Sequence, residues 1–95
     1  MSAETIHVAV GAEFAVRLAA TPATGYAWEV ASVPASLQPL GVEVAPAAGA
    51  APGDPVQQAF RWRALQAGSF VLQFALKRRW EPQPVAAHTA TVEVA

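Results

Sequence analysis

The sequence predicts an all-β protein, an immunoglobulin-like antiparallel β-sandwich of about seven strands. Apolar residues alternate with small or polar ones along most of the chain, and no window shows the 3.6-residue period of a helix. Glycine and proline interrupt the alternation roughly every 8–12 residues, as turns between short strands do. The 95 residues contain no cysteine, so the disulfide pattern of antibody domains is absent, and a small barrel is the alternative. We expect residues 1–95 to form one domain.

Alternation predicts three strands in the first third of the chain. They span residues 6–10, 14–18 and 26–31. Gly11 breaks the first strand, because glycine favours a turn over a strand interior. In the third strand Tyr26, Trp28 and Val30 share one face, which we expect to be buried.

Proline punctuates the middle of the chain. Pro34 and Pro39 make the stretch after the third strand irregular, with Leu37 expected in the core. A short strand over 40–44 follows. The next stretch, 45–55, is rich in alanine, proline and glycine, and a loop of that length in a small domain is functional or mobile.

The second half contains the strongest strand signals. A strand over 56–64 places its two arginines opposite its aromatic residues. The clearest alternation in the chain, of phenylalanine and leucine, runs over 70–76. A proline-containing loop over 77–88 then leads to a last strand over 89–94.

Composition excludes several classes of partner. The net charge is −1, with only 6 lysines and arginines, so we expect neither nucleic acid nor a membrane surface as partner. No apolar run approaches the roughly 20 residues that cross a bilayer. The first residues lack the basic and apolar regions of a signal peptide. The protein is therefore cytosolic, or a leader was removed ahead of this chain.

The sequence offers little catalytic chemistry. His7 and His88 lie in or beside predicted strands, where we interpret them as solvated or hydrogen-bonded residues rather than bases or metal ligands. The carboxylates are scattered, and there is no nucleophile elbow or phosphate loop. We therefore expect no catalytic residues, no metal and no cofactor, and interpret the chain as a binding module.

Residues 21–28 form a small turn that leads directly into an aromatic strand. Pro22 fixes its own φ, and the hydroxyl of Thr24 can bond nearby backbone. Gly25 supplies a position with φ above zero. Tyr26 then anchors the turn to the sheet. Taken alone, this is either an ordinary inter-strand loop or a narrow binding tip.

The three tryptophans differ in their surroundings. Trp28 and Trp62 have apolar neighbours two residues away and are predicted to lie in the core. Trp80 follows Arg78 and Arg79 after the apolar alternation has stopped. It is either an exposed binding residue or a ring folded back on the sandwich edge with an arginine stacked on it.

Together these stretches resemble the chagasin-like inhibitors of papain-family cysteine peptidases. That family has an immunoglobulin-like sandwich with three loops at one end. Its motifs are Asn-Pro-Thr-Thr-Gly-Tyr/Phe-x-Trp, Gly-x-Gly-Gly and Arg-Pro-Trp/Phe. The matching positions of the first and third motifs are Pro22, Thr24, Gly25, Tyr26, Trp28, Arg78 and Trp80, with Glu81 following as usual.

The chain also departs from the family pattern. Thr21 stands where the family prefers asparagine, and Ala23 where it prefers threonine. Arg79 replaces the proline of the third motif. In the middle loop only Gly53 matches, followed by Asp54.

The resemblance implies a reversible, tight-binding inhibitor whose three loops wedge into the active-site cleft. The tip at residues 21–25 would cover the catalytic cysteine and histidine, and Trp80 would pack on the primed side. Arg78 would hold its loop or meet acids of the target, and the loop around Gly53 would follow the non-primed side. The implied partner is a papain-family cysteine peptidase bound by a monomer, and the mechanism needs no cofactor. The implied protease-binding residues are Thr21, Pro22, Ala23, Thr24, Gly25, Tyr26, Gly53, Asp54, Arg78, Arg79 and Trp80.

Two other functions remain open at this point. The departures from the motifs fit a non-inhibitory immunoglobulin-like adhesion or accessory domain. A carbohydrate-binding module would need two or more exposed aromatic rings on one face, so the exposure of the tryptophans discriminates it from a wedge with one exposed ring.

Overall fold

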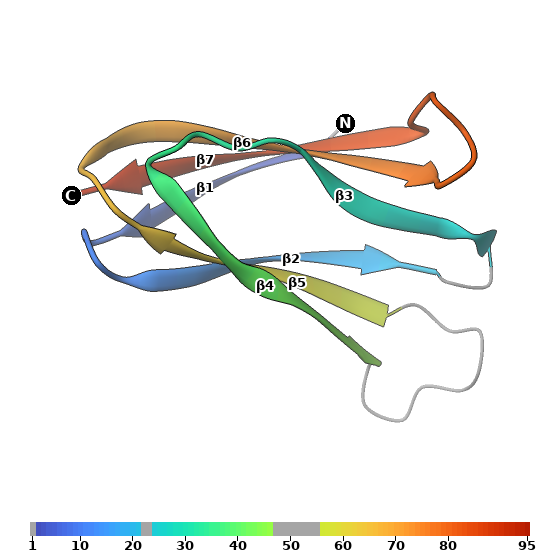
Figure 1. Cartoon of the computed structure of the whole chain (residues 1–95), viewed down its shortest axis with the longest axis horizontal. Coiled ribbons are helices and arrows are strands. Elements are labelled where there is room, and N and C mark those ends of the chain that lie inside the picture. Colours follow the sequence, from blue (N-terminus) through green and yellow to red (C-terminus); the bar gives the residue numbers. More distant parts are fainter. Residues whose placement is uncertain (1, 22–23, 47–55) are drawn as a thin grey trace.

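The structure is a computed structural model in which residues 2–21, 24–46 and 56–95 are described. These residues form two sheets that pack face to face (Figure 1). Seven strands occur in these ranges. They are β1 (Ser2–Val8), β2 (Glu13–Ala20), β3 (Tyr26–Ser32), β4 (Leu37–Pro46), β5 (Val56–Ala64), β6 (Gly68–Arg78) and β7 (Ala86–Val94). None of the described segments forms a helix with the length and apolarity that a bilayer crossing requires.

The strand pairing confirms the predicted sandwich. One sheet has four strands in the order β1-β7-β6-β3, and the other has three in the order β2-β5-β4. β1 runs parallel to β7, whereas the other hydrogen-bonded pairs among the described strands are antiparallel. Because the strands divide into two sheets, the alternative of a closed barrel does not apply.

The core lies between the sheets and is formed by the alternating apolar residues of both. Phe74 of β6 is 1% exposed, and its ring packs against Phe60 and Trp62 of β5, with centroids 5.0 and 6.5 Å apart. Leu37, expected in the core, is also 1% exposed. The buried cluster consists of Val16, Leu18, Leu37, Phe60, Trp62, Ala64, Leu72, Phe74, Ala90, Val92 and Val94.

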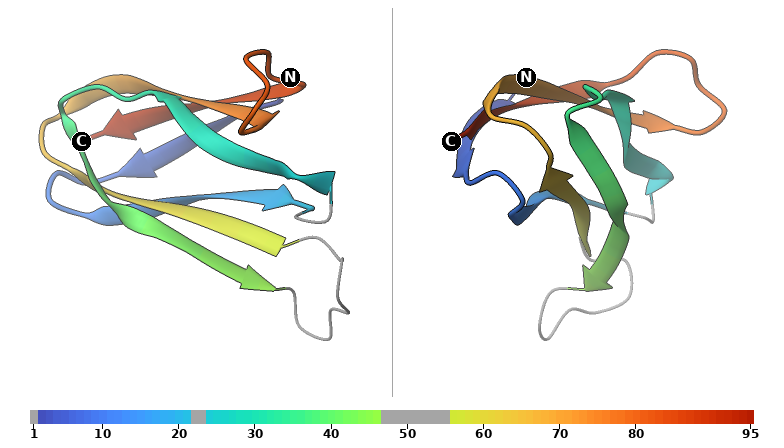
Figure 2. Two further views of the ribbon diagram at one scale, coloured as in Figure 1. Left: turned by 45° about the vertical axis from the view of Figure 1, so that its right-hand side comes forward. Right: turned by 60° about the vertical axis from the view of Figure 1, so that its left-hand side comes forward.

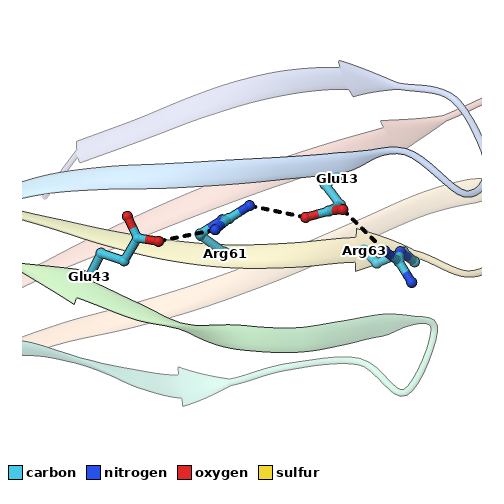
Figure 3. Close-up of polar contacts among 4 residues, drawn as sticks. All are labelled: Glu13, Glu43, Arg61 and Arg63. Atoms are coloured by element: carbon cyan, nitrogen blue, oxygen red, sulfur yellow. Dashed lines mark hydrogen bonds and ion pairs between the residues drawn. The ribbon is translucent and has the colours of Figure 1, made fainter.

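The outer face of the three-stranded sheet is polar, as the alternation of β5 predicts. Glu13 of β2 pairs with both arginines of β5, at 3.1 Å to Arg61 and 3.1 Å to Arg63. Arg61 also contacts Glu43 of β4 at 3.0 Å (Figure 3). These side chains are largely exposed, so each pair adds less than about 1 kcal/mol to stability. Their effect is to keep this face solvated and the aromatic face of β5 inward.

Strand β4 begins earlier than predicted, at Leu37, and therefore contains Pro39. It pairs only with β5 among the described strands and so forms an edge of its sheet. Proline is tolerated at an edge because the missing N–H can face away from the ladder. The register shifts between Pro39 and Gly41, where the ladder is interrupted. The predicted irregular stretch is thus present at residues 33–36, and the prediction was wrong only for residues 37–39.

Two loops differ from their predicted bounds. β4 runs to Pro46, and the rest of the middle loop, 47–55, lies outside the described residues. The loop predicted over 77–88 is shorter at both ends, since β6 continues through Arg78 and β7 begins at Ala86. Pairing with β3 holds the end of β6 in the sheet although its apolar alternation has stopped.

One end of the sandwich collects the ends of six strands. β2, β4 and β6 finish there, and β3, β5 and β7 begin there, at the right-hand side of Figure 1. The ends of β2 and β3 lie between those of β6 and β7 on one side and those of β4 and β5 on the other, in both Figure 1 and Figure 2. We call this the loop end. It brings together residues that lie more than fifty positions apart in the sequence.

Truncation of side chains on the two faces of β6 should lower the free energy of unfolding by different amounts. Leu72→Ala should lower the free energy of unfolding by about 2–5 kcal/mol, because Leu72 is 0% exposed and its removal leaves a cavity. Val71→Ala is the control on the same strand, since Val71 is 45% exposed, and it should cost less than about 1 kcal/mol. Urea unfolding followed by tryptophan fluorescence measures both. Equal losses would contradict the assignment of the core face.

Candidate binding site at the loop end

The turn between β2 and β3 is closed by its own backbone and one short side chain. The N–H of Thr24 donates to the carbonyl oxygen of Thr21 at 3.1 Å, and the Thr24 hydroxyl donates to the same oxygen at 2.7 Å. The N–H of Tyr26 donates to Oγ1 of Thr24 at 3.4 Å. Residues 22–23, which include Pro22 and Ala23 of the predicted site, lie outside the described residues. The described part of the tip is thus compact and exposed.

Gly25 occupies a position that only glycine suits. Its φ is +80°, which confirms the predicted positive value. A Cβ placed there would lie 3.1 Å from Cη2 of Trp80, closer than side chains normally pack. The glycine therefore lets the backbone turn and also lets the Trp80 ring approach the tip.

Arg78 connects the tip to the β6–β7 loop. Its Nε donates to the carbonyl oxygen of Thr24 at 3.0 Å, and its Nη1 contacts Glu81 at 3.2 Å. The guanidinium also lies over the ring of Tyr26, 4.3 Å from the centroid, because Tyr26 and Arg78 are opposite each other in the β3–β6 ladder. Of the two roles considered for Arg78, these contacts are those of holding the loops.

Trp80 projects from a tight turn next to the tip. The N–H of Glu81 donates to the carbonyl oxygen of Arg78 at 3.0 Å, which closes a β-turn with Arg79 and Trp80 at its centre. Trp80 is 69% exposed, and the Arg78 guanidinium lies 5.9 Å from its ring centroid. The exposure expected of a binding residue is therefore confirmed, whereas its binding role stays a prediction. The ring also has the Arg78 guanidinium over it, as the other alternative expected.

The other two tryptophans are less exposed than Trp80 and offer a partner less of their ring surface. Trp62 is 2% exposed, as predicted. Trp28 is half-buried against the core, and its indole N–H donates to the carbonyl oxygen of Ala19 at 2.9 Å. A single strongly exposed tryptophan ring favours a wedge over a sugar-binding face, which needs at least two.

Gln58 supports the base of the tip and was missed by the sequence analysis. Its side-chain oxygen accepts from the N–H of Trp28 at 2.8 Å, and its side-chain nitrogen donates to the Trp28 carbonyl oxygen at 3.2 Å. This amide, 8% exposed, joins β5 of one sheet to β3 of the other. The available signal was a polar residue on the otherwise apolar inward face of β5.

An open apolar groove of about 260 Å³ runs beside the tip, between β3 and the paired strands β4 and β5. Val44 is 61% exposed although it lies opposite Gln58 on the inward face of the β4–β5 ladder. Nothing in the sequence distinguished this valine from a core residue. The groove is lined by Ala20, Gly25, Tyr26, Ala27, Val44, Val56 and Gln58.

The predicted site residues thus fall into three groups. Thr21, Thr24, Gly25 and Tyr26 come together with Arg78 and Trp80. Arg79 lies beside them at the centre of the same turn. Pro22, Ala23, Gly53 and Asp54 lie outside the described residues.

The histidines are not part of this arrangement. His7 is exposed on β1, whereas His88 is buried on β7, where its Nε2 lies 2.6 Å from Oε2 of Glu4. This agrees with their interpretation as solvated or hydrogen-bonded strand residues. Among the described residues, no group of three histidine, cysteine, aspartate or glutamate side chains is placed to hold a metal ion.

Comparison with known proteins identifies a family. The family model described as "Chagasin family peptidase inhibitor I42" matches residues 7–94. Comparison with curated protein sequences gives no match.

Two solved structures share the fold. The crystal structure of the cysteine protease inhibitor EhICP2 from Entamoeba histolytica superposes with a TM-score of 0.81 at 20% identity, covering 99% of this chain and 88% of that one. The solution structure of amebosin gives a TM-score of 0.75 at 24% identity, covering 100% of this chain and 99% of that one. At these identities the likeness establishes the fold.

Substitution of Gly25 should disturb the site, and Gly11 provides a matched control. Gly11 has a similar φ of +86° at the opposite end of the sandwich, but a Cβ there would meet nothing within 4 Å. Alanine at either position should cost about 1 kcal/mol or more in backbone strain. Only Gly25→Ala should also displace the Trp80 ring.

The indole N–H signals in a two-dimensional ¹⁵N–¹H NMR spectrum report this displacement, with the Trp80 signal assigned from Trp80→Phe. The signal should shift in Gly25→Ala and stay in place in Gly11→Ala. An unmoved signal in both variants would mean that Gly25 is needed for the turn alone.

Proposed function

The chain belongs to the chagasin family of peptidase inhibitors, and from that premise we propose that its loop end wedges into the active-site cleft of papain-family cysteine peptidases. It is therefore an inhibitor and not an enzyme. Residues 1–95 act as one inhibitor domain, and one monomer binds one peptidase.

A single arrangement carries this proposal: a narrow tip and an exposed tryptophan held side by side by Arg78. The tip presents Thr24 and Gly25, which are small and exposed, so that backbone can approach a cleft floor. Trp80 offers a large apolar ring of the type that dominates binding hot spots. The contacts of Arg78 with Thr24 and Glu81 fix both parts before any partner arrives.

Inhibition rather than cleavage follows from the shape of the tip. A peptidase cleaves a segment that lies extended across its catalytic residues. The two bonds from Thr24 to the carbonyl oxygen of Thr21 hold this segment as a turn instead. The tip therefore covers the catalytic cysteine and histidine without presenting a bond in the geometry for attack. Release leaves the inhibitor intact, so inhibition is reversible.

We assign the contact surface to three segments at the loop end. The tip fills the centre, Trp80 with its neighbours binds the primed side, and the middle loop follows the non-primed side. The proposed contact residues are Thr21, Pro22, Ala23, Thr24, Gly25, Tyr26, Gly53, Asp54, Arg78, Arg79 and Trp80. Such a wedge should bury a standard interface of roughly 1,600 Å².

Prior fixation of the loops is what makes the binding tight. Ordering a loop or a side chain upon association costs free energy, which is subtracted from the contact energy. Here Gln58 pins the start of β3 to the core, and Arg78 pins the tip to the β6–β7 turn. For these described parts of the loop end, little ordering remains to be done when the peptidase binds.

Titration of papain with the purified protein tests the function directly. Hydrolysis of a fluorogenic peptide should fall in a reversible, stoichiometric manner, with Kd well below micromolar. Mass spectrometry should show the inhibitor uncut after prolonged incubation. Full activity of papain at micromolar inhibitor would contradict the proposal and bring the adhesion or accessory role forward.

The exposed tryptophan should carry a large share of the binding energy. Trp80→Ala should weaken inhibition by about 2–4 kcal/mol, roughly 30- to 1,000-fold in Kd, because a large apolar ring no longer leaves water. The free energy of unfolding should change little, since Trp80 is 69% exposed.

Leu65→Ala is the control, because Leu65 is 46% exposed and follows β5 at the opposite end of the sandwich. Its inhibition constant should equal that of the unaltered protein. If Trp80→Ala unfolds the protein while the folded fraction still inhibits normally, Trp80 has a structural role instead.

A further inference from the structure

The charges near the loop end are mostly neutralised within the chain. Arg78 pairs with Glu81 at 3.2 Å, and Lys77 pairs with Glu29 at 3.3 Å. These pairs leave the last residues of β6 with little net charge to offer a partner.

Arg79 differs from its two neighbours. It is exposed, and among the described residues it makes no ion pair. It stands directly beside Trp80, the exposed ring of the proposed contact surface. No carboxylate of the described residues therefore neutralises its guanidinium at the edge of the wedge.

Turn chemistry does not account for an arginine at this position. The Glu81 N–H to Arg78 carbonyl bond places Arg79 at the second position of a four-residue turn. Positive φ values occur only at glycines among the described residues, so Trp80 has negative φ, which is typical of a type I turn. Proline is favoured at the second position of such a turn because its φ is already fixed. The arginine gives up that advantage, and what it adds is charge.

We propose that Arg79 sets target preference: it selects papain-family peptidases that carry carboxylates on the part of the cleft rim facing Trp80. This inference rests on the proposed wedge function and adds the chemistry of the preferred partner. A peptidase with a neutral or basic rim at that place is inhibited less well.

The physical effect is that of a rim charge. A pair at the edge of an interface steers association and depends strongly on ionic strength, whereas its contribution to affinity is modest. In the proposed complex the Trp80 ring, on the neighbouring residue, excludes water from this part of the interface, and a lower local dielectric strengthens the attraction. A few-fold preference between targets is therefore the scale to expect.

A cycle of substitutions on both proteins tests the inference. The probes are papain and a papain variant in which one neutral residue of the primed-side rim is changed to glutamate. Arg79→Gln removes the charge, Arg79→Pro removes it while suiting the turn, and Arg79→Glu reverses it. Arg17→Gln is the control, because Arg17 is exposed in the middle of β2 on the outer face and its loss changes the net charge equally.

The unaltered inhibitor should bind the glutamate variant about two- to fivefold more tightly than papain at low ionic strength. The gain should vanish in Arg79→Gln and Arg79→Pro, invert in Arg79→Glu, and persist in Arg17→Gln. It should shrink as sodium chloride is raised, with the change chiefly in the association rate.

The outcomes distinguish a failure of this inference from a failure of the proposed wedge function. If Trp80→Ala weakens inhibition but all Arg79 variants keep the unaltered preference, Arg79 plays no part in target choice and only the inference fails. Loss of the preference in Arg17→Gln as well would assign it to net charge and also overturn the inference. If papain is not inhibited at all, the wedge function itself fails.

Discussion

The Arg78 guanidinium is the contact on which the arrangement of the loop end depends. One side chain binds the carbonyl oxygen of Thr24, pairs with Glu81 and covers the Tyr26 ring. These partners come from the tip, from the β6–β7 turn and from the start of β3. Only a planar group with donors in several directions can serve all of them, and lysine, which is a point charge on a flexible stem, cannot.

A second contact connects the loop end to the core. Gln58 satisfies both backbone groups of Trp28 from the opposite sheet, so β3 cannot shift relative to β5 without leaving buried polar groups unpaired. The tip directly precedes the stretch of β3 that this amide holds. The indole N–H of Trp28 adds a second directional bond between the sheets, to the carbonyl oxygen of Ala19 on β2. The apolar side chains between the sheets tolerate sliding, so the bonds of Gln58 and of the Trp28 indole fix the relative position of the two sheets at the loop end.

Alternation was enough to predict most strands and the core, because a two-residue period leaves few ways to bury one face. The motif also predicted the positive φ of Gly25, because the backbone geometry of a tight turn is determined by the local sequence. Strand bounds failed where pairing decides them, as at Leu37 and at the end of β6. The inward-facing polar Gln58 was visible in the sequence, but its bonds to Trp28 and the exposure of Val44 could not be predicted, because both depend on which strand of the other sheet lies opposite. The contact roles of the tip and the middle loop, and the one-domain expectation, stay predictions.

Arg78 and Arg79 show how little a residue type says about its role. They are adjacent in the sequence and carry the same charge, yet Arg78 forms a hydrogen bond and an ion pair within the chain, whereas Arg79 forms no ion pair among the described residues. The end of β6 between the two residues explains the division. Arg78, the last residue of β6, meets Tyr26 across the ladder, whereas Arg79 lies beyond the strand in the turn. A fixed scaffold and a free charge thus sit one residue apart. An exchange at Arg79 can change the choice of partner without loosening the tip, which Arg78 continues to hold.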